Sequence, residues 1–137
     1  MNAKLNNLLI EKYPVLFRQM KYLNIGDGWF HLMDELCEAI EKWNTKGKDP
    51  VVFNKIDQFG GGLRVRVNRE YDDSIYVLLN HYNLISKSVC EFCGKAHPEA
   101  IVKRIEHKHL AICDQCYETG RKIDEIREKG RRAGGSK

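Results

Sequence analysis

The chain has 137 residues, of which 42% are hydrophobic and 31% are charged. This composition is typical of one compact globular domain or two small ones, and it excludes a long disordered chain. No apolar run approaches the ~18 residues of a membrane span, and the N-terminus lacks the apolar core of a signal peptide, so we expect a protein of the reducing cytoplasm without a membrane partner.

The net charge of +4 comes from the C-terminal end of the chain. Residues 121–137 carry seven Lys or Arg and three acidic residues, whereas residues 1–120 carry 16 of each sign. Because most of the protein is neutral, a general polyanion-binding function is disfavoured. Residues 131–137 are expected to form a flexible basic tail. The basic residues of this end that are candidates for contact with nucleic acid or a partner are Arg121, Lys122, Arg131 and Arg132.

The N-terminal part of the chain predicts two helices. The first spans residues 2–12, and the leucines that share one face of it are Leu5, Leu8 and Leu9. Residues 26–28 (GDG) predict a turn in which Asp27 could cap a helix over residues 29–43. Apolar residues recur at spacings of three and four along that helix, which indicates one buried face. Cys37 lies on this face and is expected to be a buried thiol rather than a ligand or nucleophile.

A β-hairpin and a third helix are predicted next. Two strands, 51–59 and 63–67, flank three consecutive glycines that favour a hairpin turn. The second strand alternates apolar residues with Arg64 and Arg66, as a half-buried strand does. These two arginines lie either on a solvated sheet face or at a contact with an anion, nucleic acid or partner. A helix follows from residues 72–74 to about Ser86.

The last third of the chain contains two pairs of cysteines. The cysteine pairs lie in CEFCG at residues 90–94 and in CDQC at residues 113–116, and 19 residues separate Cys93 from Cys113. This spacing matches the C-x2-C…C-x2-C form of zinc sites, in which four thiolates complete a tetrahedral coordination shell. We therefore expect one structural Zn²⁺ ion, bound by Cys90, Cys93, Cys113 and Cys116. The predicted division is a body of residues 1–88 and a zinc module of residues 89–130.

The order of elements around these cysteines indicates the type of zinc module. A knuckle-like CEFCG loop comes first, then residues 102–112 (VKRIEHKHLAI), which can form a hairpin, and then a helical stretch at residues 117–130. Knuckle, hairpin and helix in this order are typical of a treble-clef zinc finger, and a zinc ribbon is the alternative. The predicted fold class is α+β: helices and a short antiparallel hairpin, with a C-terminal treble-clef-like zinc finger.

Three histidines, His97, His107 and His109, lie in or near the predicted zinc-module hairpin. The simplest interpretation is that they are partly exposed polar residues. The alternative is an HNH-type nuclease, because such enzymes are also treble clefs and Glu106-His107 imitates their catalytic histidine. An HNH site also needs an Asn-bearing loop and a further His or Asn to hold Mg²⁺. We therefore assign no catalytic residue and lean towards a protein that is not an enzyme.

The motifs in combination resemble a known group of sequences. YPVLFRQM, GDGWFHLMDELCEAIE, NKIDQFGGGLRVRV, CEFCG and CDQC are similar to an uncharacterised family of small phage and prophage proteins with a GDGW helix start, an FGGLR-like hairpin and a CExCG…CxxC module. The resemblance covers roughly residues 13–116. At residues 54–59 a less basic run replaces the family pattern, and a third glycine is inserted.

This resemblance implies a phage or mobile-element protein in the cytoplasm of a host cell, where small proteins often modulate host macromolecules. The leading expectation is a non-enzymatic zinc protein that binds a host or phage protein complex, acting as an inhibitor, for example of a defence system. The alternatives are a nucleic-acid-binding zinc-finger protein and an HNH-like metal-dependent nuclease.

Overall fold

The computed structural model describes residues 1–44, 49–71, 73–105 and 107–120 and has the predicted α+β class. Its elements are α1 (Ala3–Lys12), the 3-10 turn η1 (Asp27–Trp29), α2 (Phe30–Asn44), β1 (Phe53–Phe59), β2 (Gly62–Val67), α3 (Asp73–Ser86), β3 (Ala100–Ile105) and β4 (Lys108–Cys113). Residues 114–120 are also helical. Among the helices of these residues, none is long and apolar enough to cross a lipid bilayer.

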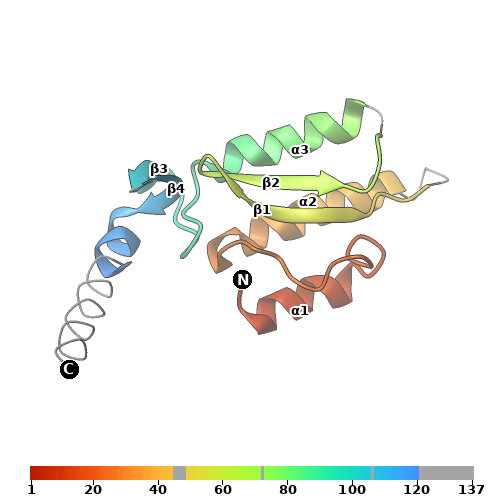
Figure 1. Ribbon diagram of the computed structural model, residues 1–137, viewed down its shortest axis with the longest axis horizontal. Helices are drawn as coiled ribbons and strands as arrows, with labels where there is room; N and C mark the ends of the chain where they lie inside the picture. Colours follow the sequence, from red (N-terminus) through yellow and green to blue (C-terminus); the bar gives the residue numbers. More distant parts are fainter. Residues whose placement is uncertain (45–48, 72, 106, 121–137) are drawn as a thin grey trace, which may run out of the picture.

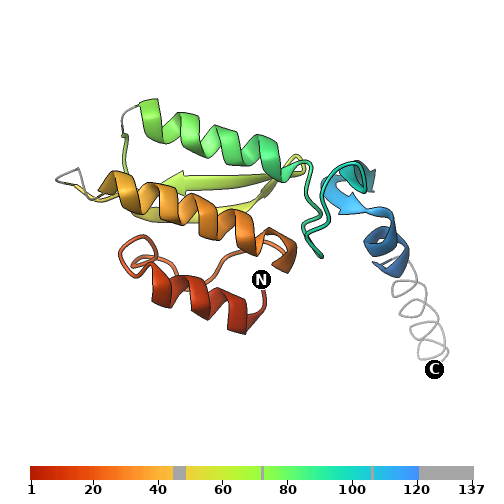
Figure 2. The same cartoon turned by 180° about the vertical axis from the view of Figure 1, so that it is seen from behind.

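The body of the protein is a two-stranded sheet with helices on one side. Strands β1 and β2 pair in antiparallel orientation, and α3 packs on β2 and on α2. Figure 1 shows the β1–β2 hairpin in front of α2 and α3, and Figure 2 shows the same helices in front of the hairpin from behind. Helix α1 lies beside α2. One face of the hairpin is therefore covered by helices, and no described helix lies over the other.

Helix α1 confirms the first predicted helix but not its apolar face. Leu9 is buried, whereas Leu8 is 47% exposed. A polar residue, Asn6, is buried instead and is 2% exposed. Its amide group donates to the carbonyl of Lys21 at 2.9 Å and accepts from the backbone N–H of Leu23 at 2.9 Å. Both hydrogen bonds satisfy the buried amide, which fixes the return of the chain from α1 towards α2.

Helix α2 has the buried face that its periodicity predicts. The buried residues at its start and along it are Trp29, Leu32, Met33, Leu36, Cys37 and Ile40. The predicted cap is wrong. The carboxylate of Asp27 accepts hydrogen bonds from the backbone N–H and side-chain amide of Asn2, at 2.7 and 3.0 Å. Asp27 thus joins the starts of α1 and α2, and the regular helix begins at Phe30 after a 3-10 turn.

The β1–β2 hairpin is confirmed, including its glycine turn. Gly60 and Gly61 have φ values of 61° and 83°, in the left-handed region that favours glycine. Ile56 and Leu63 are 1% and 2% exposed and belong to the main core. The tip of the hairpin also touches the C-terminal part of the protein, because a Cβ atom at Gly61 would lie 2.8 Å from the side chain of Val102.

The described C-terminal part consists of a loop, the antiparallel β3–β4 hairpin and the helical residues 114–120. Its predicted hairpin is confirmed. Ala111 of β4 is fully buried and belongs to the same core cluster as the helices of the body. The C-terminal part is therefore packed against the body and not merely tethered to it.

Candidate metal centre

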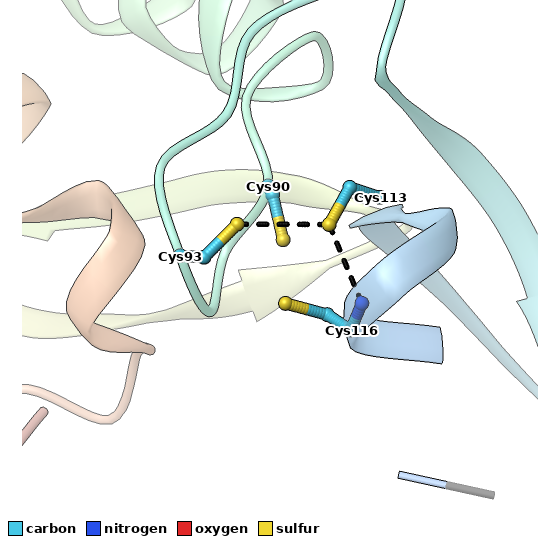
Figure 3. Close-up of side chains that lie close together, drawn as sticks. All are labelled: Cys90, Cys93, Cys113 and Cys116. Carbon is cyan, nitrogen blue, oxygen red and sulfur yellow. Dashed lines mark hydrogen bonds between the residues drawn. The ribbon is translucent and has the colours of Figure 1, made fainter. Parts of the chain in front are cut away.

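Three different pieces of backbone bring the four cysteines together. Cys90 and Cys93 lie in the loop after α3, Cys113 ends β4, and Cys116 lies in the first turn of the following helix. Figure 3 shows the four side chains pointing toward one another. All four sulfur atoms lie within 4.8 Å of one another, and those of Cys93 and Cys113 are 3.6 Å apart. Tetrahedral Zn–S bonds of about 2.3 Å place sulfurs roughly 3.8 Å apart, so this arrangement suits a single metal ion.

The loop around the first pair is shaped by backbone hydrogen bonds. The N–H of Cys90 donates to the carbonyl of Lys95 at 2.7 Å, and that of Gly94 donates to the carbonyl of Cys90 at 2.9 Å. Gly94 has a φ of 85°, in the left-handed region that favours glycine. The loop closes on itself and directs both of its sulfurs to the same side.

The second pair uses the start of a helix. The backbone N–H of Cys116 donates to the sulfur of Cys113 at 3.4 Å, drawn as a dashed line in Figure 3. A backbone donor on a sulfur stabilises the thiolate, which is the form that binds metal. The helix therefore supplies both the fourth sulfur of the group and a stabilising contact to the third.

The pKa values of the thiols differ because the four groups crowd together. Burial raises the pKa of Cys90, but hydrogen bonds from the backbone N–H groups of Cys113, Cys93 and Phe92 bring it down to about 7. Partial burial of their sulfurs, together with contacts to neighbouring thiols, raises the pKa of Cys93 and of Cys116. Four close thiolates repel one another unless a cation lies between them, so a divalent ion would ionise all four.

The site has no position left for a substrate once four sulfurs bind a tetrahedral metal. Cys90 and Cys113 are 0% and 2% exposed, whereas Cys93 is exposed and Cys116 is half-buried, so protein would cover the ion on one side and leave the other side near solvent. The buried cluster on this side is small and consists of Cys90, Ala100, Ile112 and Cys113. Such a cluster supplies little hydrophobic stabilisation, so we expect the metal to supply much of the folding free energy of this part.

The loop of the first pair is fastened to the body by the start of α2. The backbone N–H of Gly26 donates to the Glu91 carboxylate at 2.9 Å, and that of Gly28 donates to the Glu91 carbonyl at 2.7 Å. A Cβ atom at Gly28 would lie 2.1 Å from the Cys90 carbonyl oxygen, and one at Gly26 would lie 2.2 Å from that of Glu91. Both glycines are therefore required by the close approach of the cysteine loop.

Trp29 and Glu91 complete this contact, which we call the latch (Gly26, Gly28, Trp29 and Glu91). The indole N–H of Trp29 donates to the carbonyl of Val89 at 2.9 Å, and Trp29 is fully buried. Glu91 is 7% exposed, and burial raises its pKa. Its second carboxylate oxygen is buried without a hydrogen-bond partner among the described residues. Sequence reasoning missed the latch, although the sequence shows an acidic residue between Cys90 and Cys93 and a glycine pair before a helix.

None of the other candidate residues that the structure describes belongs to the cysteine group. Arg64 forms a two-bond ion pair with Asp57, at 2.7 and 2.6 Å, and Arg66 is exposed on the same strand. Arg121, Lys122, Arg131 and Arg132 lie outside the described residues, as does the predicted tail. His97, His107 and His109 are exposed, and Glu106 is not among the described residues. Within the described part of the chain, the group of residues that could hold a metal consists of the four cysteines.

Comparison of the chain with family models, with curated proteins and with solved structures gives no match. The family resemblance therefore stays a prediction, and function has to be argued from the cysteine site and from the protein surface.

Proposed function

We propose that Cys90, Cys93, Cys113 and Cys116 bind one structural Zn²⁺ ion. The proposal depends on a single observation: four sulfur atoms from separate elements lie within 4.8 Å of one another. Four thiolates in tetrahedral geometry suit zinc or iron. We choose zinc because a structural zinc ion does not require the protein to have a redox function. When bound, the ion would neutralise part of the thiolate charge and join the cysteine loop, β4 and the last helix.

The module is proposed to be of the treble-clef type. Support comes from the order of its parts, which are a cysteine loop, the β3–β4 hairpin and a helix that carries Cys116. A zinc ribbon would take its second pair of ligands from a second knuckle loop. Here the second pair joins the end of a strand to a helix, which favours the treble clef.

The protein as a whole is proposed to be a non-enzymatic binder of a protein complex, of phage or mobile-element type, that inhibits or modulates its partner. A closed tetrathiolate site leaves no coordination position for catalysis. The neutral charge of residues 1–120 favours a protein partner over nucleic acid. The exposed histidines supply no further metal group among the described residues, so the nuclease alternative has no structural support.

Metal analysis of the purified protein tests the first part of the proposal. Native mass spectrometry and elemental analysis should find one zinc ion per chain. Iron in place of zinc would correct the metal, and a metal-free, folded protein would refute the site.

Activity assays and affinity capture test the second part. Capture from bacterial lysate should retain a defined protein complex with the zinc-loaded protein and lose it with the chelated protein. Magnesium-dependent DNA cleavage that disappears in His107→Ala would instead establish the nuclease.

A further inference from the structure

One face of the β1–β2 hairpin carries charged and aromatic side chains. Lys55 lies opposite Arg66 in the strand register, and Asp57 lies opposite Arg64. Phe59 follows at the end of β1, and the guanidinium of Arg64 lies 4.8 Å from the centre of its ring. We call these five residues the outer hairpin face. Strand residues between them, such as Ile56 and Leu63, point the other way into the core.

No described helix covers the outer hairpin face. Figures 1 and 2 together show α2 and α3 on the opposite side of the hairpin. Phe59 is 67% exposed, among the most exposed of the large apolar side chains in the described part of the chain. Lys55 and Arg66 are also exposed. A sheet face that combines an exposed aromatic ring with cations has the composition of an interface and not that of an ordinary solvated surface.

Three side chains of this face, those of Asp57, Arg64 and Phe59, contact one another before any partner binds. Asp57 is 8% exposed and binds the guanidinium of Arg64 through two hydrogen bonds of 2.7 and 2.6 Å. The same guanidinium lies over the ring of Phe59, so the cation–π contact with Arg64 restricts the orientation of the ring. A fixed ring loses little conformational entropy on binding, which favours affinity. Arg66 has no ion-pair partner among the described residues and is available for one.

We infer that the outer hairpin face is the docking surface for an acidic segment of a partner protein. The inference rests on the proposed protein-binding function and names the surface and the chemistry of the partner. Three cations and one carboxylate give the face a net charge of +2, whereas the formal charges of the other residues up to residue 120 sum to −2. Arg66 and Lys55 would pair with carboxylates of the partner, and Phe59 would contact an apolar side chain between them.

The small number of cations on the outer hairpin face favours an acidic protein segment over nucleic acid as its partner. Nucleic-acid affinity comes mainly from neutralising many phosphates, typically about 6–10 in a stable complex. Asp57 already pairs with Arg64 and lies 3.6 Å from the ammonium of Lys55. The face therefore offers few free cations, enough for a short acidic segment but not for a phosphate backbone.

A defined acidic polypeptide tests the surface directly. The probe is a fluorescent random copolymer of glutamate and tyrosine, and its binding to the zinc-loaded full chain is measured by anisotropy at two salt concentrations. We expect saturable binding that weakens at least fivefold in Arg66→Gln and in Phe59→Ala, and at least twentyfold in the double variant. The matched controls are Lys4→Gln on α1 and Val77→Ala, 68% exposed on α3, which should leave affinity unchanged.

Four outcomes would overturn the inference. The copolymer fails to bind the wild-type protein, or the double variant binds it normally while unfolding at the wild-type temperature. A 20-nucleotide oligothymidine that binds more tightly than the copolymer, and is lost in the double variant, would replace the acidic protein by a nucleic acid. If the double variant still captures the same complex from lysate as the wild type, the docking surface is wrong although the proposed function stands.

Discussion

Cys37 and Cys113 are both buried thiols, yet their surroundings give them different chemistry. Burial, together with the charges of Asp34 and Glu41, raises the pKa of Cys37, so it stays a neutral core residue. Cys113 has three other sulfurs nearby and an N–H group directed at its own sulfur. The burial of Cys37 and the closeness of Cys113 to three other cysteines agree with the sequence, in which Cys37 belongs to a helix period and Cys113 to a C-x2-C pair.

Replacing the ligand Cys113 by serine should remove the metal. A hydroxyl group is a poor replacement for a thiolate on zinc, so we expect stoichiometric loss of zinc by elemental analysis. The matched change Cys37→Ala should keep one zinc ion and cost about 1–2 kcal/mol of stability, as a small cavity in a core does. Equal zinc content in the two variants would contradict the assignment of ligands.

A cluster of three side chains joins α1 to α2. The hydroxyl of Tyr13 donates to the carboxylate of Asp34 at 2.7 Å, and the ammonium of Lys12 donates to the same carboxylate at 2.9 Å. The bonds from Lys12 and Tyr13 lower the pKa of Asp34, and burial with the Asp34 contact raises the pKa of Tyr13 to about 12. Asp34 therefore stabilises the fold above its ordinary pKa, and its contribution is lost as the pH falls below about 4.

Tyr13 gives the opposite dependence on pH. Its neutral form is favoured in the folded protein, so its contribution is complete below about pH 10 and is lost as the pH rises towards 12. In urea unfolding between pH 9 and 11.5, the wild type should lose about 2 kcal/mol more stability than Tyr13→Phe. Tyr22→Phe, at a 65% exposed residue, is the control and should follow the wild type. Parallel curves for wild type and Tyr13→Phe would refute this role.

At the scale of elements, local patterns predicted the helices and hairpins well. The period of α2 and the alternation of Arg64 and Arg66 in β2 identify a helix face and a strand face, because burial imposes those periods. The hydrogen bonds that Asp27 and Asn6 form were not predicted, since their partners lie far away in the sequence. The latch was missed for the same reason: the glycines at residues 26 and 28 look like a local turn until the cysteine loop lies against them.

We expect the latch to support the affinity of the cysteine site for metal. In Gly28→Ala, the new methyl group would overlap the Cys90 carbonyl, so the loop must move and the sulfurs must lose their arrangement. We expect zinc affinity to fall about 10–100-fold in competition with a chelator, the usual effect of disturbing the groups that support metal ligands. Gly120→Ala has open space around the new atom and should keep wild-type affinity. Equal affinities for the two variants would show that the latch does not support the site.

For the whole molecule, the proposed metal and the hydrophobic core are expected to stabilise different regions. The main core joins α1, α2, α3 and the β1–β2 hairpin, whereas the cysteine side has only a small buried cluster. Contacts cross the predicted boundary at residue 88, because the latch and Ala111 both join the two parts. The sequence predicted that a hydrophobic core would stabilise the body and a metal ion the C-terminal part. It did not predict the residues through which the two parts pack against each other.

Removing the metal should therefore unfold one part of the molecule and spare the other. After chelation, we expect backbone amides of β3 and β4 to exchange hydrogen within minutes, while those of α2 stay protected. Hydrogen-exchange mass spectrometry of the loaded and chelated protein measures both regions at once. Simultaneous loss of protection in α2 would show that the body also depends on the ion.

The hydrogen bond from Trp29 to Val89 has a practical consequence, because it places an intrinsic fluorophore at the junction of the two parts. The chain contains two tryptophans, so replacing Trp43 by phenylalanine leaves Trp29 as the sole indole emitter. Its emission should shift to longer wavelength when the cysteine loop separates and water reaches the indole. Metal loading could then be followed optically, in real time and without a label.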